Sequence, residues 1–141
     1  MPISIQLSQG LLTPQGEREV FPLIADALLR AHGLDGNAFM TPNVIGHVTV
    51  SPESASYAGG RPQSLAVVEV KVPATTFPDA SVKQAFVGEV TDIIDRLKAS
   101  PHPRERTFVN VTYALDGAWG IGGKAYTNEE LGAAIQQAAT G

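Results

Sequence analysis

Hydrophobic and polar positions follow two different periods along the first half of the chain. Residues 3–7, ISIQL, alternate with period two, which predicts a half-buried strand. A Thr-Pro pair at 13–14 precedes apolar residues that recur every three or four positions up to Gly33, which predicts an amphipathic helix. A second strand is predicted over residues 44–50, and residues 57–61, YAGGR, predict a hairpin turn built on glycines.

The same order of patterns returns in the second half of the chain. Residues 65–72, LAVVEVKV, predict a strand, and Phe-Pro-Asp at 77–79 opens a second amphipathic helix that ends before the prolines at 101 and 103. Residues 107–113, TFVNVTY, predict another strand, and residues 118–126, AWGIGGKAY, predict another hairpin on glycines.

This duplication predicts the fold class. We expect one domain over 1–141, with pseudo-repeats of roughly 62 residues at about 2–63 and 64–127 and a short helix over 128–138. A strand, a crossover helix and a second strand imply parallel pairing within each repeat. The predicted fold is α/β (α+β): two β-α-β units form a four-stranded, mainly parallel sheet with two helices on one face, plus short hairpins.

The second face of this sheet has no predicted cover. Strand residues such as Val48, Val50, Val109 and Val111, or their alternates, would point there, and an apolar face of that area is unfavourable in water. We therefore expect several copies of the chain to pack their sheets against one another.

Composition narrows the class of partner. The net charge is −4, and the ten Lys and Arg residues are spread along the chain, which argues against nucleic-acid binding and against a membrane anchor. The chain has no Cys, which removes disulfides and thiolate chemistry, and no apolar run approaches the ~20 residues of a membrane span. No secretory signal pattern is visible either, so a cytoplasmic location is expected.

Pro2 stands directly before the first strand. Inside a chain it only starts the strand, but removal of Met1 would turn it into a secondary amine on a rigid ring. Together with the duplicated β-α-β units and the Trp119-Gly-Ile-Gly-Gly hairpin, it resembles the tautomerase superfamily, typified by 4-oxalocrotonate tautomerase and including macrophage migration inhibitory factor.

The resemblance implies a mechanism and an assembly. It implies a homotrimer of double units with Pro2 at the base of a pocket between units. The neutral Pro2 nitrogen would act as a general base on carbon next to a carbonyl, with no metal and no cofactor. An amino-terminal amine has a reference pKa of about 7.7–8.0, and burial near cations lowers it toward neutral pH, where a base works well.

The arginines that the family places around the proline are not at the matching positions. Those positions carry uncharged residues: Leu11 or Leu12, Thr75 or Thr76, Thr49 and Asn110. The cations that could replace them are Arg18, Arg61, Lys71 and Lys124.

Other candidate substrate-binding residues come from the hairpins and the strands, and Asn110 is one of those from the strands. Trp119 matches the family's pocket aromatic, and Tyr57 is its looser counterpart in the first repeat. His47 shares a strand face with Thr49, where it would be a donor or a second acid/base group or simply a subunit contact. Arg61 and Lys124 follow equivalent hairpins, and either could line the pocket or stay a solvated turn residue.

Two other site types are excluded by the sequence. GIGGK lacks the glycine and the Ser or Thr of a phosphate loop, because Ala118 and Ala125 stand at those positions. The three His residues and the scattered carboxylates show no metal-ligand spacing.

We therefore expect a tautomerase or isomerase that interconverts keto and enol forms of a small 2-oxo acid or an aryl pyruvate. The alternatives are a hydrolytic dehalogenase or decarboxylase on the same fold, and a noncatalytic oligomeric ligand-binding protein.

Overall fold

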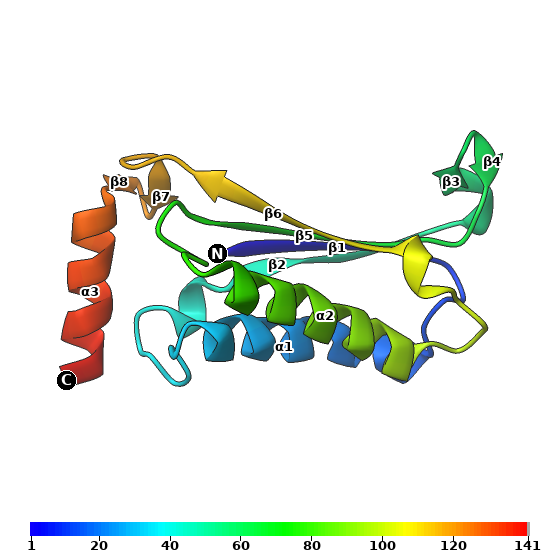
Figure 1. Cartoon of the computed structure of the whole chain (residues 1–141), viewed down its shortest axis with the longest axis horizontal. Coiled ribbons are helices and arrows are strands. Elements are labelled where there is room, and N and C mark those ends of the chain that lie inside the picture. The colour runs from blue at the N-terminus through cyan, green and yellow to red at the C-terminus, as the bar shows by residue number, and fades with distance from the viewer. Residues whose placement is uncertain (141) are drawn as a thin grey trace.

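Four strands form one mixed sheet in a computed structural model that describes residues 1–140 (Figure 1). They are β1 (Pro2–Ser8), β2 (Ile45–Ser51), β5 (Ala66–Pro73) and β6 (Thr107–Ala114), in the order β2-β1-β5-β6. The pairs β1·β2 and β5·β6 are parallel, as predicted for strands joined by a crossover helix. The central pair, β1·β5, is antiparallel and joins the two halves of the chain.

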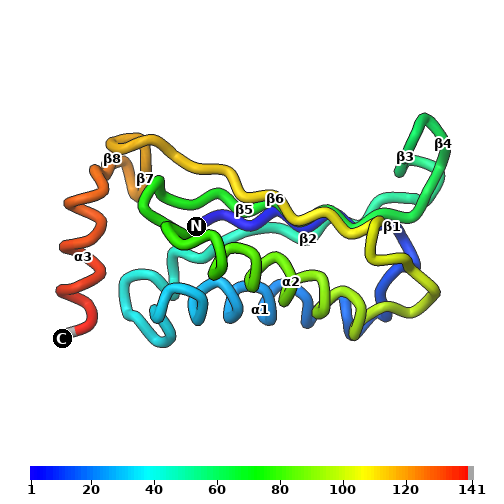
Figure 2. The backbone as a smooth tube through the Cα atoms, viewed as in Figure 1, coloured from blue at the N-terminus to red at the C-terminus, as the bar shows by residue number. Residues whose placement is uncertain are grey.

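Two long helices cover one face of the sheet and lie side by side (Figures 1 and 2). In α1 (Pro14–Ala31) the Thr13 side chain accepts a hydrogen bond from the first turn, and in α2 (Ala80–Leu97) Asp79 does the same. Caps of this kind stabilise a helix by about 1 kcal/mol each. Both helix starts were predicted from these residues.

The core lies between these helices and the sheet. Every second residue of β1 and β5 is buried there, and the apolar stripes of α1 and α2 pack onto them. Each such side chain contributes about 1.5–3 kcal/mol when it leaves water. The largest fully buried side chains are Phe86, Ile3, Ile5, Leu7, Leu11, Ile24, Leu28, Met40, Ile93, Ile94, Val20 and Val68.

The open face of the sheet is more polar than the sequence interpretation allowed. Val48, Val109 and Val111 pack against the core on the helix side, because they pair in register with the buried Ile5, Val68 and Val70. Val50 shares their strand parity but is 39% exposed at the edge strand β2. Of the two alternating sets of strand residues, the set with these valines therefore faces the helices, and the expectation of an apolar open face is wrong.

The alternate strand residues occupy the open face instead. Most of them are exposed and polar, and they are Ser4, Gln6, His47, Thr49, Glu69, Lys71, Asn110 and Thr112. Ile45 and Phe108 are the large exposed apolar side chains among them, at 56% and 46%. An apolar driving force for covering this face is accordingly confined to its two edge strands.

Two short hairpins and a third helix extend beyond the sheet. The first hairpin is β3 (Tyr57–Ala58) with β4 (Arg61–Pro62), and the second is β7 (Trp119–Ile121) with β8 (Lys124–Tyr126). They lie at opposite ends of the molecule, and α3 (Asn128–Thr140) follows the second one (Figure 1). The glycine pairs between their strands have positive φ, as predicted for tight turns. Short 3₁₀ turns complete the chain: η1 (Thr41–Asn43), η2 (Glu53–Ala55) and η3 (Arg104–Arg106).

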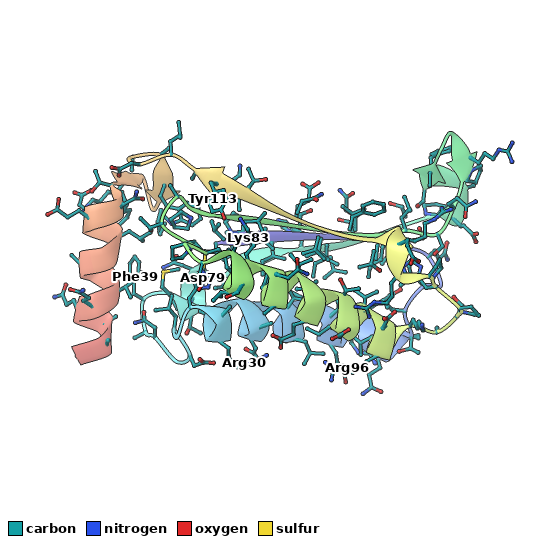
Figure 3. The ribbon with its side chains drawn as sticks, viewed as in Figure 1. Arg30, Phe39, Asp79, Lys83, Arg96 and Tyr113 are labelled. Carbon is teal, nitrogen blue, oxygen red and sulfur yellow. The ribbon has the colours of Figure 1, made fainter. Side chains whose placement is uncertain are left out.

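Exposed charges of the helix layer form pairs and, around Asp95, a small network with Arg104 and Lys98. Arg30 of α1 pairs with Glu89 of α2, and Lys83 lies beside Tyr113, 3.5 Å from its hydroxyl (Figure 3). Exposed pairs of this kind contribute only about 0–1 kcal/mol. Within the described residues, no helix is both long and apolar enough to cross a bilayer.

His102, before β6, makes stability depend on pH. Its side chain is 5% exposed, with Nε2 2.9 Å from the Thr107 hydroxyl, and burial lowers its pKa below 6.5 while the nearby Asp95 opposes that shift. The neutral ring is therefore favoured in the fold. The contribution of His102 to the free energy of unfolding is complete above pH 6.5. It is lost as the pH falls toward the lower pKa that His102 has in the folded chain.

We expect the free energy of unfolding of the wild-type chain to fall more steeply with acid than that of His102→Gln, which cannot titrate. Urea titrations between about pH 7.5 and pH 5 measure this difference. The same pH dependence in the two proteins would show that His102 does not cause the loss of stability in acid.

Candidate functional site

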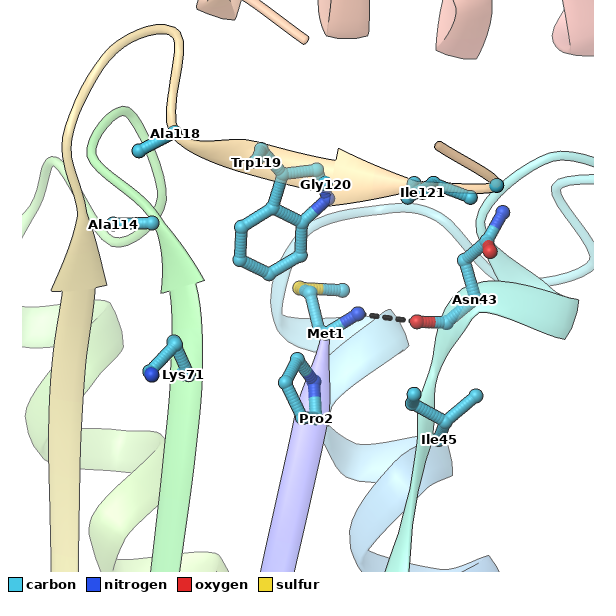
Figure 4. A pocket seen from close by; sticks show the side chains of 11 residues that line it. Met1, Pro2, Asn43, Ile45, Lys71, Ala114, Ala118, Trp119, Gly120 and Ile121 are labelled. Carbon is cyan, nitrogen blue, oxygen red and sulfur yellow. Dashed lines mark hydrogen bonds between the residues drawn. The ribbon is translucent and has the colours of Figure 1, made fainter. Parts of the chain in front are cut away.

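Pro2 lies at the mouth of a cavity of about 350 Å³ at the end of the sheet (Figure 4). Below, this space is called the Pro2 cavity. β1 supplies Pro2, β5 supplies Lys71, and the second hairpin supplies Trp119 and Ile121. The wall therefore combines residues from both halves of the chain, and most of it is apolar.

Met1 occupies the end of this cavity. Its side chain is 3% exposed, and its amine donates a hydrogen bond to the carbonyl oxygen of Asn43 (Figure 4). Burial lowers the pKa of that amine from 8.0 to about 6. The surroundings of the Met1 amine thus favour the neutral form of an amine at neutral pH. While Met1 is attached, the Pro2 nitrogen is an amide and cannot act as a base.

Lys71 is the one charged side chain among the described residues that line the Pro2 cavity. The antiparallel register pairs Ile3 with Val70, so the next position along β5, Lys71, lies across from Pro2. The sequence presented Lys71 only as one of four cations. Its place beside Pro2 follows from the β1·β5 register, for which the sequence has no local signal.

Trp119 forms the wall above Met1. It is 7% exposed, and its Nε1 has no hydrogen-bond partner within the described chain. A buried N–H without a partner is uncommon in folded proteins. The structure brings Trp119 and Pro2 to one cavity, while its role in binding stays a prediction.

A neighbouring cavity of about 290 Å³ opens on the sheet face and also includes Pro2 and Lys71. His47 of β2 and Glu69 of β5 line it, and Ser4 pairs in register with both. Cross-strand neighbours on one face have Cβ atoms about 4.5–5.5 Å apart. His47 is therefore near Pro2 in space, as a candidate acid/base group must be.

Four other predicted binding residues lie away from the Pro2 cavity within one chain. Tyr57 and Arg61 are on the first hairpin, at the far end of the molecule (Figure 1). Asn110 of β6 pairs in register with Glu69 and lines neither cavity that contains Pro2. Lys124 pairs with Glu130 of α3.

Lys124 follows the second hairpin turn, but its ammonium points toward α3. Its Nζ is 3.3 Å from a carboxylate oxygen of Glu130 and 4.5 Å from the centre of the Tyr126 ring. The pKa of Glu130 is lowered, first by the hydrogen bond that its carboxylate accepts from the Thr127 backbone N–H and then by Lys124. Among the described residues, no group of three or more His, Asp or Glu side chains is placed to hold a metal ion.

Comparison with known proteins gives a structural match. No family model matches the sequence, and no curated protein sequence does. A fused 4-OT solved as a symmetric trimer is 14% identical, with a TM-score of 0.75 over 94% of this chain and 99% of its own. The FG41 malonate semialdehyde decarboxylase inhibited by 3-bromopropiolate is 16% identical, with a TM-score of 0.65 over 86% and 89%.

A macrophage migration inhibitory factor homologue from Prochlorococcus marinus is also similar. It is 17% identical, with a TM-score of 0.67 over 89% of this chain and 99% of its own. These matches extend over nearly the whole chain and include both β-α-β units. The chain therefore has the tautomerase-superfamily fold.

Proposed function

We propose that this chain is a cofactor-independent tautomerase that interconverts keto and enol forms of a small 2-oxo acid or an aryl pyruvate, with Pro2 as its general base. The observation that carries the proposal is the position of Pro2 at a mostly apolar cavity whose one charged side chain is Lys71. Apolar walls and a nearby ammonium both favour the neutral form of an amine.

In this mechanism Met1 has been removed and the Pro2 nitrogen holds a lone pair. It takes the proton of the enol hydroxyl and returns it to C3, so that one proton moves and no atom is gained or lost. The Lys71 ammonium binds the carboxylate and stabilises charge that develops on the adjacent oxygen. The Trp119 ring forms an apolar wall with a free N–H donor.

We propose that the active form is a homotrimer in the cytoplasm that binds no nucleic acid. The solved fused 4-OT neighbour is described as a trimer, which supports an oligomer of this kind. We propose that Lys71 takes the place of an arginine within one copy, and that Tyr57, Arg61 and Asn110 bind substrate only if the trimer brings them to the Pro2 cavity of another copy.

Decarboxylation or hydrolysis on the same fold is the second candidate. The sheet-face cavity places Glu69 and His47 near Pro2, and these groups can orient or activate water. A decarboxylase is also among the structural neighbours. This chemistry needs a protonated Pro2, whereas burial lowers the pKa of the amine that occupies this place, Met1, to about 6. The tautomerase is therefore proposed first.

The first test compares the processed chain with a chain that retains Met1, made while the host aminopeptidase is inhibited. Mass spectrometry identifies each amino terminus, and ketonisation of phenylenolpyruvate is followed by absorbance. Because an amide nitrogen is not a base, we expect kcat/KM to fall by about 10²–10⁴ when Met1 is retained. Pro2→Ala, which keeps a flexible primary amine, should lie between them. Equal rates above that in buffer would exclude Pro2 as the base, and rates equal to that in buffer would favour a noncatalytic ligand-binding protein.

The second test replaces the Lys71 ammonium. In Lys71→Gln we expect KM for the carboxylate substrate to rise by about tenfold or more, because a charge-assisted contact is lost. The acid limb of the kcat/KM profile should also move to higher pH, since a nearby cation no longer disfavours protonation of Pro2. Lys98→Gln is the matched control, because Lys98 pairs with Asp95 at the end of α2. An unchanged acid limb would show that Lys71 does not influence the pKa of the base.

The third test addresses the second candidate. Malonate semialdehyde is incubated with the processed chain, and acetaldehyde and CO₂ are measured. We expect no release above the rate in buffer. Release that depends on Pro2 and is reduced in Glu69→Gln would instead assign the decarboxylation to this site.

A further inference from the structure

Met1 separates two cavities. One is the Pro2 cavity; the other, of about 170 Å³, lies beneath α3 and is called the inner cavity below. Of the described residues, only Met1 lines both of them. Its side chain is also 3% exposed. The Met1 side chain is therefore the wall between the two spaces.

One residue that lines the inner cavity has an unused hydrogen-bond acceptor. His32 at the end of α1 lines it, and its Nδ1 is 2.8 Å from the carbonyl oxygen of Leu28. A carbonyl only accepts, so Nδ1 carries the hydrogen and the neutral ring keeps a lone pair on Nε2. Nε2 is buried and has no partner among the described residues. A buried polar atom without a partner is uncommon in folded proteins and calls for an explanation.

Packing fixes the direction of this acceptor. The His32 ring meets Phe77 edge to face with 4.5 Å between ring centres, and Phe77 in turn packs on Phe86. Phe77 has a φ of 53°, which is uncommon for a residue with a side chain, so the surrounding contacts hold it in place. His32 is consequently a positioned group and not a freely rotating surface residue.

We propose that removal of Met1 joins the two cavities, and that the inner cavity then binds the arm of a straight-chain 2-oxo acid that ends in a hydroxyl group. An aminopeptidase hydrolyses the Met1–Pro2 bond: water supplies the OH to the Met1 carboxyl and a hydrogen to the Pro2 nitrogen. The terminal hydroxyl of the substrate donates to His32 Nε2. This assignment rests on the proposed function of Pro2.

The position of the reacting carbon supports this substrate class. A carbon that exchanges a proton with the Pro2 nitrogen must come within about 3 Å of that nitrogen. The Met1 backbone fills this space while Met1 is attached. An arm on that carbon begins where the Met1 side chain begins. Because methionine is unbranched, its space admits a linear arm better than an aryl group. The carboxylate then extends toward Lys71, on another side of Pro2 (Figure 4).

Gly132 of α3 offers a way to close the inner cavity. It lines that cavity, and a Cβ added to it would meet no atom within 4 Å. Gly132→Leu places a side chain there and suits a helix better than glycine. Gly88→Leu in α2 is the matched control, since its added Cβ also meets no atom within 4 Å.

The test measures kcat/KM of the processed chain for enols of 2-oxobutanoate, 2-oxohexanoate and 6-hydroxy-2-oxohexanoate. We expect Gly132→Leu to lower the ratio of long to short substrate by about tenfold or more, because each methylene excluded costs that much. Gly88→Leu should leave the ratio as in wild type. His32→Leu should remove about a tenfold preference for the hydroxylated arm, and His32→Gln, which keeps an acceptor, should restore part of it.

Calorimetric binding of 6-hydroxy-2-oxohexanoate separates this inference from the proposed function. If turnover is absent but the processed chain binds the long acid about tenfold more tightly than Gly132→Leu and the Met1-retaining chain do, the inner cavity stands and the tautomerase proposal fails. If turnover is present but neither Gly132→Leu nor His32→Leu changes the ratios, the inner-cavity assignment is overturned and the role of Pro2 stands. His32→Leu keeps the test decisive if Gly132→Leu does not fold.

Discussion

The antiparallel pairing of β1 with β5 is the constraint on which the rest of this structure depends. Each half of the chain supplies one parallel pair of strands under one helix, and neither pair alone buries enough surface to be stable. The β1·β5 register places Ile3, Ile5 and Leu7 in line with buried residues of the second half, so the two halves share one core. The same register brings Lys71 across from Pro2.

That pairing also explains why the two halves are not interchangeable. The first half contributes Pro2, and the second contributes Lys71 and Trp119. In the proposed mechanism, one such site per chain has one amine and one cation. The missing arginines therefore do not leave the cavity without positive charge, because Lys71 supplies it from a strand position.

The elements of the fold could be predicted from the sequence because their signals are local. Thr13 and Asp79 mark the helix starts, and period-two alternation marks the strands. The predicted parallel pairing inside each half also matches the sheet. The antiparallel junction could not be predicted, because it depends on how two finished units meet. Which of the two alternating sets of strand residues faces outward could not be predicted either, since a shift of one residue exchanges the two faces.

The candidate site was predictable only in part. Pro2 and Trp119 carry sequence signals, and the structure places them at one cavity. Lys71 and His32 have none, because their importance depends on neighbours that are distant in the sequence. Tyr57 and Arg61 show the opposite case: they repeat a pattern around a hairpin, but that hairpin lies at the other end of the molecule.

The burial of Met1 also sets an order of events during synthesis. An aminopeptidase must hold an extended terminus in its own active site, and in the folded chain this residue is 3% exposed with its amine bonded to Asn43. Under the proposed function, Met1 must therefore be removed before the chain closes over it, while synthesis lengthens the chain at about 5–20 residues per second. The proposed chemistry of Pro2 thus depends on whether trimming or burial of Met1 comes first.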